Sequence, residues 1–148
     1  MKAITIKQPW ASLIAFGEKY NETRSWRTKY RGEIFIHAGK QVDKEAFNME
    51  CIKDTLNKHG IYKVEDLPTG CIIAKCKLTD VRQVLSENYH EGVISFTDLS
   101  ELKGKEIAFG DYSKGRYAWK LEDIIQLKEP IPCKGQLSIW NYEGGDKN

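Results

Sequence analysis

Residues 17–32 read GEKYNETRSWRTKYRG, and this stretch together with the segments on either side of it indicates the fold. It is crowded with groups that are costly to bury, because Lys19, Glu22 and Arg24 stand close to Trp26. An apolar segment, PWASLIAF at 9–16, precedes it, and a strand-like segment, GEIFIHAG at 32–39, follows it. We therefore expect its charges to line a cleft beside a helix.

The flanking periodicity predicts a mixed α/β (α+β) fold in which strands outnumber helices. Pro9 suits a first helical turn and Gly17 a helix end, which predicts a helix over 9–16. Asp43 and Gly60 predict a second helix over 43–59. The polar residues 83–105 are expected to form a loop with a short helix. Strands are expected at 3–7, 32–39, 69–81 and 115–127, with a last short element at 135–142.

The length of 148 residues favours one domain, placed at 1–142, with a disordered tail at 143–148. Hydrophobic residues make up 41% and charged residues 30%, as in ordinary globular proteins. No apolar run is long enough to span a bilayer, and no signal peptide is evident at the N-terminus. This points to a cytoplasmic or nuclear protein with no membrane partner, and we expect a cytoplasmic one.

The sequence lacks the motifs that mark several common kinds of enzyme and binding site. There is no P-loop, no dinucleotide-binding glycine pattern and no nucleophile elbow. The three histidines stand far apart without chelating spacing, so we expect no metal and no cofactor. His37 is expected to be a hydrogen-bonded structural histidine.

Positive charge is concentrated at the start of the chain, where residues 1–40 hold eight Lys or Arg against three Asp or Glu. A basic segment of this kind suits a polyanionic partner. The alternative is a solvated charged face with no partner. If the partner is a nucleic acid, the candidates for phosphate contacts are Lys7, Arg27, Lys29, Arg31 and Lys40.

If residues 20–26 are extended, Glu22, Arg24 and Trp26 share one face. A paired Glu and Arg beside a flat ring would match a nucleobase, which has a planar ring and a donor–acceptor edge. The alternative is a structural Glu–Arg pair beside core tryptophans. Spacing alone leaves both interpretations open.

At these residues the sequence resembles the ASCH domain family (activating signal cointegrator 1 homology). The resemblance rests on a Pro-Trp helix at Pro9 and Trp10, then Gly-x-Lys-x-x-Glu-x-Arg-x-Trp over 17–26, then Arg-Gly and Ile-His-Ala over 31–38. Later segments, LPTGCIIAKCKLTDV, GRYAWKLED and EPIPCKGQLSIW, also look like the family's strands. The match covers the chain except residues 41–64 and 83–110.

The resemblance implies a PUA-like fold, a small β-barrel with flanking helices. It also implies RNA or DNA binding in a cleft between the first helix and the barrel, lined by Lys19, Glu22 and Arg24. The full set of candidate ligand contacts is Gln8, Trp10, Ser12, Lys19, Glu22, Arg24, Trp26, Tyr117 and Trp119. The expected partner is RNA, single-stranded nucleic acid or a nucleoside.

Two other functions remain open. Related amidohydrolases act on N4-acetylcytidine with the motif's lysine as base and a threonine three residues later as nucleophile. Here that later position is Glu22, and Thr23 would face the other side of a strand. A metal-independent hydrolase of a nucleoside or RNA would use Lys19, Glu22 and Arg24 as catalytic groups. The second alternative is a coactivator-type module with a protein partner in transcription or translation.

Overall fold

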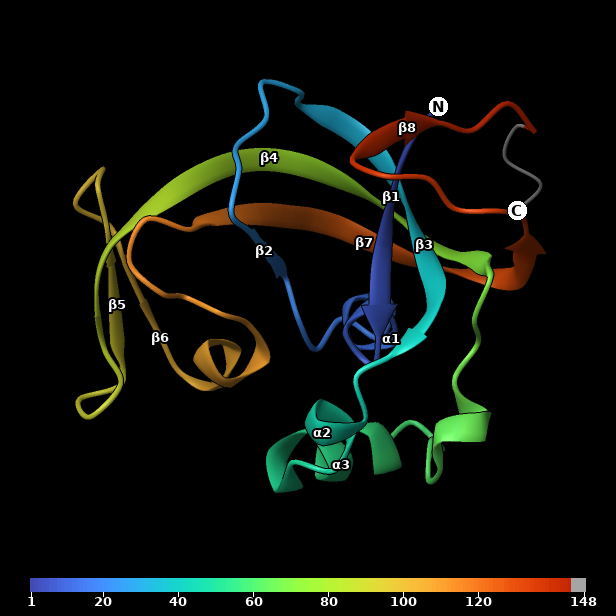
Figure 1. The fold of residues 1–148 in the computed structure, drawn as a ribbon, viewed down its shortest axis with the longest axis horizontal. Coiled ribbons are helices and arrows are strands. Elements are labelled where there is room, and N and C mark those ends of the chain that lie inside the picture. Colours follow the sequence, from blue (N-terminus) through green and yellow to red (C-terminus); the bar gives the residue numbers. More distant parts are fainter. Residues whose placement is uncertain (145–148) are drawn as a thin grey trace. The chain divides into compact units, whose positions relative to one another are not determined.

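Two long strands, β4 (Cys71–Asn88) and β7 (Tyr117–Pro132), form the framework of the computed structural model, which describes residues 1–144 (Figure 1). Both strands run through two compact units. The first unit contains residues 1–19, 33–76 and 123 onward, and the second contains residues 20–32 and 77–122. Each unit has its own sheet portion and its own apolar cluster.

In the first unit, β1 (Lys2–Gln8) lies between β3 (Gly32–Val42) and β8 (Ile139–Asn141). It pairs in parallel with β3 and antiparallel with β8. Alternation in AITIK and GEIFIHAG therefore marks real strands, as predicted. The inward side chains form an apolar cluster made of Ala3, Phe35, Ile72, Leu127, Ile131 and Trp140.

The first predicted helix is confirmed with slightly shorter bounds as α1 (Trp10–Ala15). Gly17 follows it with φ +76°, a conformation that glycine adopts without strain, so the predicted helix end is correct. One feature of its pattern is different. Although Ser12 is polar and a candidate ligand contact, it is only 1% exposed.

The predicted helix over 43–59 is wrong as one element, because it is divided into α2 (Lys44–Phe47) and α3 (Glu50–Asn57). Asp43 does cap α2, since its carboxylate accepts the Ala46 N–H at 3.0 Å. The break follows from Asn48, whose side-chain amide donates to the Lys44 carbonyl at 3.0 Å. Asparagine competes in this way for helical backbone groups, and the next residue, Met49, is extended.

In the second unit, β2 (Asn21–Arg24) pairs antiparallel with β7. The extended segment predicted over 20–26 is therefore confirmed for residues 21–24, while the chain bends at residues 25 and 26. The expected loop over 83–105 is wrong. β4 continues to Asn88, and β5 (Val93–Phe96) and β6 (Glu101–Lys103) pair beside it, followed by the 3₁₀ helix η2 (Lys105–Phe109). Each short strand buries only one or two apolar side chains, so no periodicity was visible. The cluster consists of Val84, Ile94, Phe96, Leu102, Tyr112 and Ala118.

The strand pairing confirms the mixed α/β class but does not close a barrel. The order in the first unit is β7-β4-β3-β1-β8, and in the second it is β2-β7-β4-β5-β6. The expected small β-barrel is therefore not confirmed, because the sheet of the described residues is open. The 3₁₀ helix η1 (Val64–Asp66) completes the elements. The predicted disordered tail falls largely on residues 145–148, outside the described residues.

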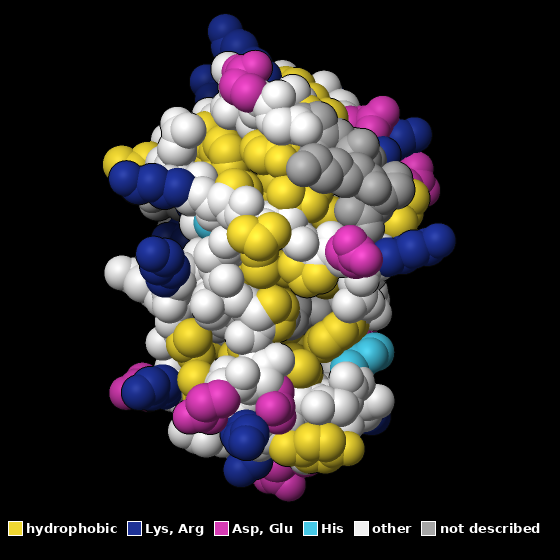
Figure 2. Space-filling model, turned by 90° about the vertical axis from the view of Figure 1, so that its right-hand side faces the viewer, with side chains coloured by type: hydrophobic (Ala, Val, Ile, Leu, Met, Phe, Trp, Pro, Cys, Tyr) yellow, Lys and Arg dark blue, Asp and Glu magenta, His cyan; other side chains and the backbone are white. Residues whose placement is uncertain are grey.

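The surface that lies to the right in Figure 1 carries hydrophobic side chains over much of its upper part, with charged side chains at its edges (Figure 2). Between residues 1 and 144, no helix is both long and apolar enough to cross a membrane.

Candidate functional site

Four side chains of the predicted site lie on one face of the β2–β7 ladder in the second unit. Glu22 pairs with Trp119, and Arg24 pairs with Tyr117. Residues directly opposite each other in an antiparallel ladder project from the same face, and so do residues two apart on one strand. The prediction that Glu22 and Arg24 share a face is therefore confirmed, and the pairing adds two aromatic residues to it.

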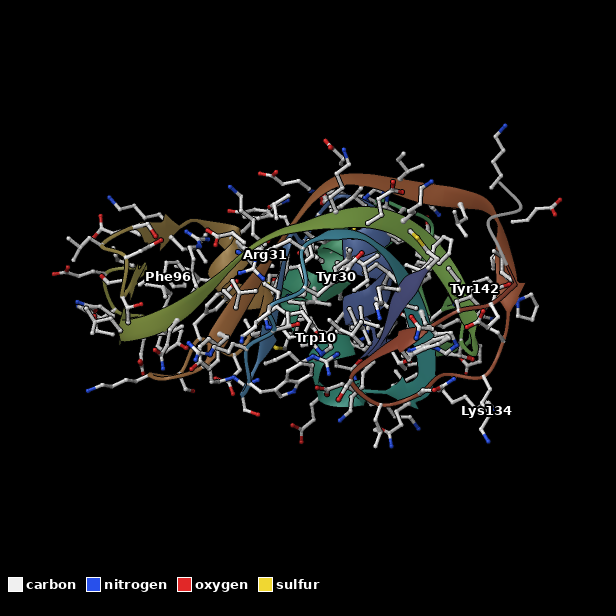
Figure 3. The ribbon with its side chains drawn as sticks, turned by 90° about the horizontal axis from the view of Figure 1, so that it is seen from above. Trp10, Tyr30, Arg31, Phe96, Lys134 and Tyr142 are labelled. Atoms are coloured by element: carbon white, nitrogen blue, oxygen red, sulfur yellow. The ribbon has the colours of Figure 1, made fainter. Side chains whose placement is uncertain are left out.

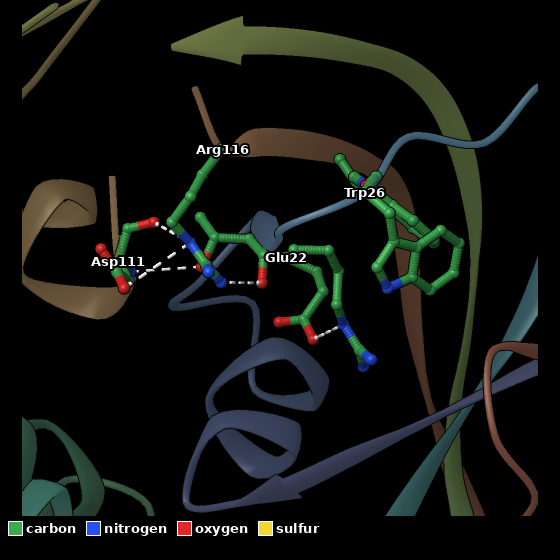
Figure 4. A network of polar contacts seen from close by, with 7 residues as sticks. Glu22, Trp26, Asp111 and Arg116 are labelled. Atoms are coloured by element: carbon green, nitrogen blue, oxygen red, sulfur yellow. Dashed lines mark hydrogen bonds and ion pairs between the residues drawn. The ribbon is translucent and has the colours of Figure 1, made fainter. Parts of the chain in front are cut away.

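The Glu22 and Arg24 side chains are joined directly. Arg24 Nε donates to Glu22 Oε2 at 2.8 Å (Figure 4). The Arg24 side chain is 24% exposed and the Glu22 side chain 11% exposed. The predicted hydrogen bond is confirmed, and the pair is neither fully buried nor fully solvated. Charge–charge interactions of such a partly exposed pair are less screened than in bulk water.

Trp26 is held at the end of this face by Trp119. The two rings meet edge to face, with centroids 4.7 Å apart and planes at 87°. Trp119 Nε1 also donates to the Trp26 carbonyl at 3.2 Å. Trp119 is 1% exposed, whereas Trp26 is half-buried. Trp119 thus serves as a buried support, and Trp26 is the tryptophan of this pair that remains partly accessible.

The remaining ligand candidates belong to the first unit, and two of them, Gln8 and Ser12, lie at the start of α1. Gln8 Nε2 donates to Ser12 Oγ at 2.8 Å and to the Pro68 carbonyl at 2.7 Å. Gln8 Oε1 accepts the Ser12 N–H at 2.9 Å. Both residues are fully buried. Their mutual bonds fix the beginning of the helix, a structural role that the sequence pattern did not indicate.

Lys19 is 1% exposed, although it carries a charge in its ordinary state. Its Nζ lies 5.7 Å from the centroid of the Trp10 ring, a cation–π distance. Trp10 itself, labelled in Figure 3, is half-buried. Lysine side chains are rarely this deeply buried, and such positions are common at functional sites, so this position is a candidate for function.

Glu106 is an important residue that sequence reasoning missed. It is 2% exposed, and its carboxylate accepts the backbone N–H of Tyr20 at 3.1 Å and of Asn21 at 3.0 Å. These bonds fix the start of β2, directly before Glu22. Burial raises the pKa of the Tyr20 hydroxyl, and the Glu106 carboxylate raises it further. No pattern in the polar stretch around Glu106 marks these contacts, because Glu106 lies 86 positions from Tyr20 and 85 positions from Asn21 in the chain.

The opposite face of β2 is occupied by a separate polar network. Thr23 Oγ1 accepts the Asp111 N–H at 3.2 Å, and Arg116 Nη2 donates to the Thr23 carbonyl at 3.3 Å (Figure 4). Arg116 Nε lies 3.6 Å from Asp111 Oδ2. Hydrogen bonding by Ser113, together with Arg116, holds the pKa of Asp111 below its ordinary value. Thr23 therefore faces away from Glu22, as the sequence predicted.

The five candidate phosphate contacts are all exposed, two in the first unit and three in the second. Arg31 differs from the others because its Nη1 donates to the carbonyls of Thr28 at 2.9 Å and Tyr30 at 2.8 Å. It therefore shapes the segment before β3 (Figure 3). Substitution of Lys29 is therefore a more direct test of a phosphate contact in this segment than substitution of Arg31.

His37 is hydrogen-bonded through both ring nitrogens and is 2% exposed, which confirms the prediction for it. In the part of the chain that the structure describes, no group of three or more His, Cys, Asp or Glu side chains is placed to hold a metal ion.

The chain belongs to the ASCH domain family, whose family model matches residues 4–131. It is 26% identical over 142 residues to human activating signal cointegrator 1 and 27% identical over 142 residues to the mouse protein of that name. Each alignment covers 95% of this chain but only 22% of the relative. The chain thus spans about a fifth of the length of these curated relatives.

Proposed function

We propose that this ASCH domain binds single-stranded nucleic acid, with RNA as the principal ligand, and holds one base against Glu22, Arg24 and Trp26. The observation that carries the proposal is the partly exposed Glu22–Arg24 pair beside a half-buried tryptophan. Carboxylate and guanidinium groups recognise the donor–acceptor edge of a base, and the ring offers a stacking surface. Family membership supports the same role.

We extend the proposal to the residues of the first helix. Lys19 precedes Glu22 by only three residues, so the chain keeps the two positions close to each other. In this proposal Lys19 and Trp10, both in the first unit, also contribute to holding the ligand. Gln8 and Ser12 keep the helix start in place. Tyr117 and Trp119 support the sheet side.

A binding titration tests the proposal directly. Short single-stranded RNA, single-stranded DNA and duplex DNA would be titrated at low salt and again at rising salt. Affinity should be highest for single strands and should fall as salt increases, because phosphate contacts release counterions. Undetectable binding of all three nucleic acids at low salt would overturn the proposal.

A protein-interaction role is the second candidate, because the curated relatives carry the name of a signal cointegrator. In that role the same basic surface would meet an acidic protein segment in transcription or translation. An acidic peptide added to the RNA titration separates the two roles. If RNA binds more tightly than an acidic peptide of matched charge, the result favours recognition of nucleotides. If the peptide binds more tightly than RNA, the result favours a coactivator-type module.

A hydrolase role rests on the buried Lys19 beside Trp10, three residues before Glu22. Its substrate would be a modified nucleoside or RNA, and the Thr23 hydroxyl, which accepts the Asp111 N–H, would not be the nucleophile. The hydrolase role would be supported if the chain forms product from N4-acetylcytidine or RNA and Lys19→Ala abolishes this activity.

A cytoplasmic location is part of the proposal and is tested by imaging a tagged chain.

A further inference from the structure

A pocket in the first unit shares none of its lining residues with the proposed base site. Its volume is about 760 Å³, within the range of small-ligand pockets. It is formed by the strands β1 and β3, the turn before β4 and the segment that follows β7. The residues that matter for its chemistry are His37, Lys40, Lys134, Gly135, Gln136 and Leu137.

One wall of the pocket is rigid. Trp140 Nε1 donates to Thr5 Oγ1 at 3.1 Å, Thr5 Oγ1 lies 3.2 Å from His37 Nδ1, and His37 Nε2 lies 2.8 Å from the Cys133 carbonyl. A carbonyl only accepts, so Nε2 carries the proton. Both sides of the imidazole ring are thus fixed by partners, and the wall exists before any ligand arrives.

Gly135 lets the segment after β7 lie directly on this wall. A Cβ atom at this position would be 2.6 Å from Thr5 Oγ1 and 2.9 Å from His37 Nδ1, closer than side chains approach. Gly39 and Gly70 also line the pocket. Three glycines around one pocket leave backbone groups open to close approach by a ligand, as in sites that hold phosphate groups.

The charge of the pocket is positive. Lys40, at the end of β3, and Lys134, in the segment after β7, are both exposed, and none of the described lining residues is acidic. Lys134 points outward at the periphery of the view in Figure 3. Leu137 at the same pocket is 92% exposed, so it offers an apolar surface, and Gln136 adds an amide that both donates and accepts.

We propose that this pocket binds a second nucleotide of the RNA strand, with its phosphate at Lys40 and Lys134 and its base beside Leu137 and Gln136. The inference rests on the proposed function and adds a site to it. Two lysines supply point charges suited to a phosphate, and an apolar side chain with a neighbouring amide suits a base. An acidic peptide would satisfy the lysines but would leave the apolar surface and the amide without a matching group.

The test is a titration of the full chain, labelled with ¹⁵N, with adenosine 5′-monophosphate, adenosine, inorganic phosphate and short RNA. The monophosphate should shift the amide signals of Gly70 and Gly135, and adenosine should shift them less at equal concentration. Changing Lys40 and Lys134 to Ala should weaken the monophosphate about tenfold or more, as expected for the loss of charge-assisted contacts. The matched control changes Lys53 and Lys58, exposed lysines of the first unit outside the pocket, and should have no effect.

RNA affinity separates this inference from the proposed function. The Lys40 and Lys134 changes should lower RNA affinity, whereas Glu22→Gln should lower RNA affinity and leave the monophosphate shifts at Gly135 unchanged. RNA binding without any shift at Gly70 and Gly135 would overturn the pocket assignment and leave the proposed function intact. Monophosphate shifts without RNA binding would overturn the proposed function and show a free-nucleotide site instead of a strand site. Equal shifts with an acidic peptide would also overturn the assignment.

Discussion

The carboxylate of Glu106 accepts the backbone N–H of Asn21 at 3.0 Å, and so ties η2 to the first residue of β2. The same carboxylate accepts the Tyr20 N–H at 3.1 Å. Glu22 follows immediately, so the position of the proposed base site depends on a residue far along the chain. Glu106 is a positioning residue in this arrangement, because it acts through the backbone of β2.

Removing this carboxylate should loosen β2. Glu106→Ala removes the acceptor of the buried Asn21 N–H, which should cost about 1–3 kcal/mol, and that of the part-buried Tyr20 N–H, which should cost less. RNA affinity of the folded fraction should also fall, because Glu22 loses its fixed backbone. Thermal unfolding and RNA titration of the variant measure the two effects. Glu101→Gln, at an exposed position of β6, is the matched control. A Glu106→Ala protein with normal stability would contradict this role.

The Glu22–Arg24 pair should serve the ligand more than the fold. Glu22→Gln and Arg24→Lys keep most of the side-chain volume but change the charge or the planar guanidinium. We expect small changes in melting temperature and about a tenfold or greater loss of RNA affinity. If the pair were structural, breaking it would cost about 3–5 kcal/mol of stability in a deeply buried setting.

A second ion pair in the same unit provides the control for these variants. Lys120 Nζ and Glu122 Oε1, also two positions apart, lie 3.2 Å from each other on β7. Glu122→Gln should change neither stability nor RNA affinity appreciably. Large destabilisation by Glu22→Gln, with normal affinity in the folded fraction, would refute the ligand role.

Lys29 should contact a phosphate. Lys29→Ala should weaken binding of all sequences about equally and lower the salt slope of log K by about 0.7, the value for one phosphate of a single strand. Affinity would be measured by fluorescence anisotropy over a series of salt concentrations. Lys53→Ala, at an exposed position of α3, should leave the slope unchanged. Weaker binding with an unchanged slope would show that Lys29 acts in another way.

Asp111 should make stability depend on acid pH. Its pKa lies below the ordinary 3.8, chiefly because the Ser113 hydroxyl donates to the carboxylate. A lowered pKa in the folded state gives stability that is present above the unfolded value and is lost as the pH falls through the folded value. Asp111→Asn should therefore lower the melting temperature at neutral pH, and the difference from the unchanged chain should shrink in acid. A difference that stays constant into strong acid would contradict the role.

The candidate site was predictable from sequence where its contacts are local. Glu22 and Arg24 are two apart, so strand geometry alone places them on one face. Glu106 was not predictable, because its partners are distant in the chain and a glutamate in a polar stretch carries no pattern. The break at Asn48 was not predictable, because Asp43 and Gly60 are typical of the two ends of a helix and the apolar residues between them follow helical spacing. β5 and β6 were missed because strands so short show no alternation.

The boundary between the two units falls inside β4, at Cys76–Lys77, and inside β7, at Glu122–Asp123. A backbone cut at either place therefore severs a strand instead of a linker. Neither unit is one continuous piece of chain, so no truncation yields either unit alone. When one unit unfolds, β4 and β7 lose pairing partners in that unit, and the same two strands continue into the other unit. Heat should consequently unfold the chain in one cooperative transition, and a destabilising change in either unit should lower that single midpoint.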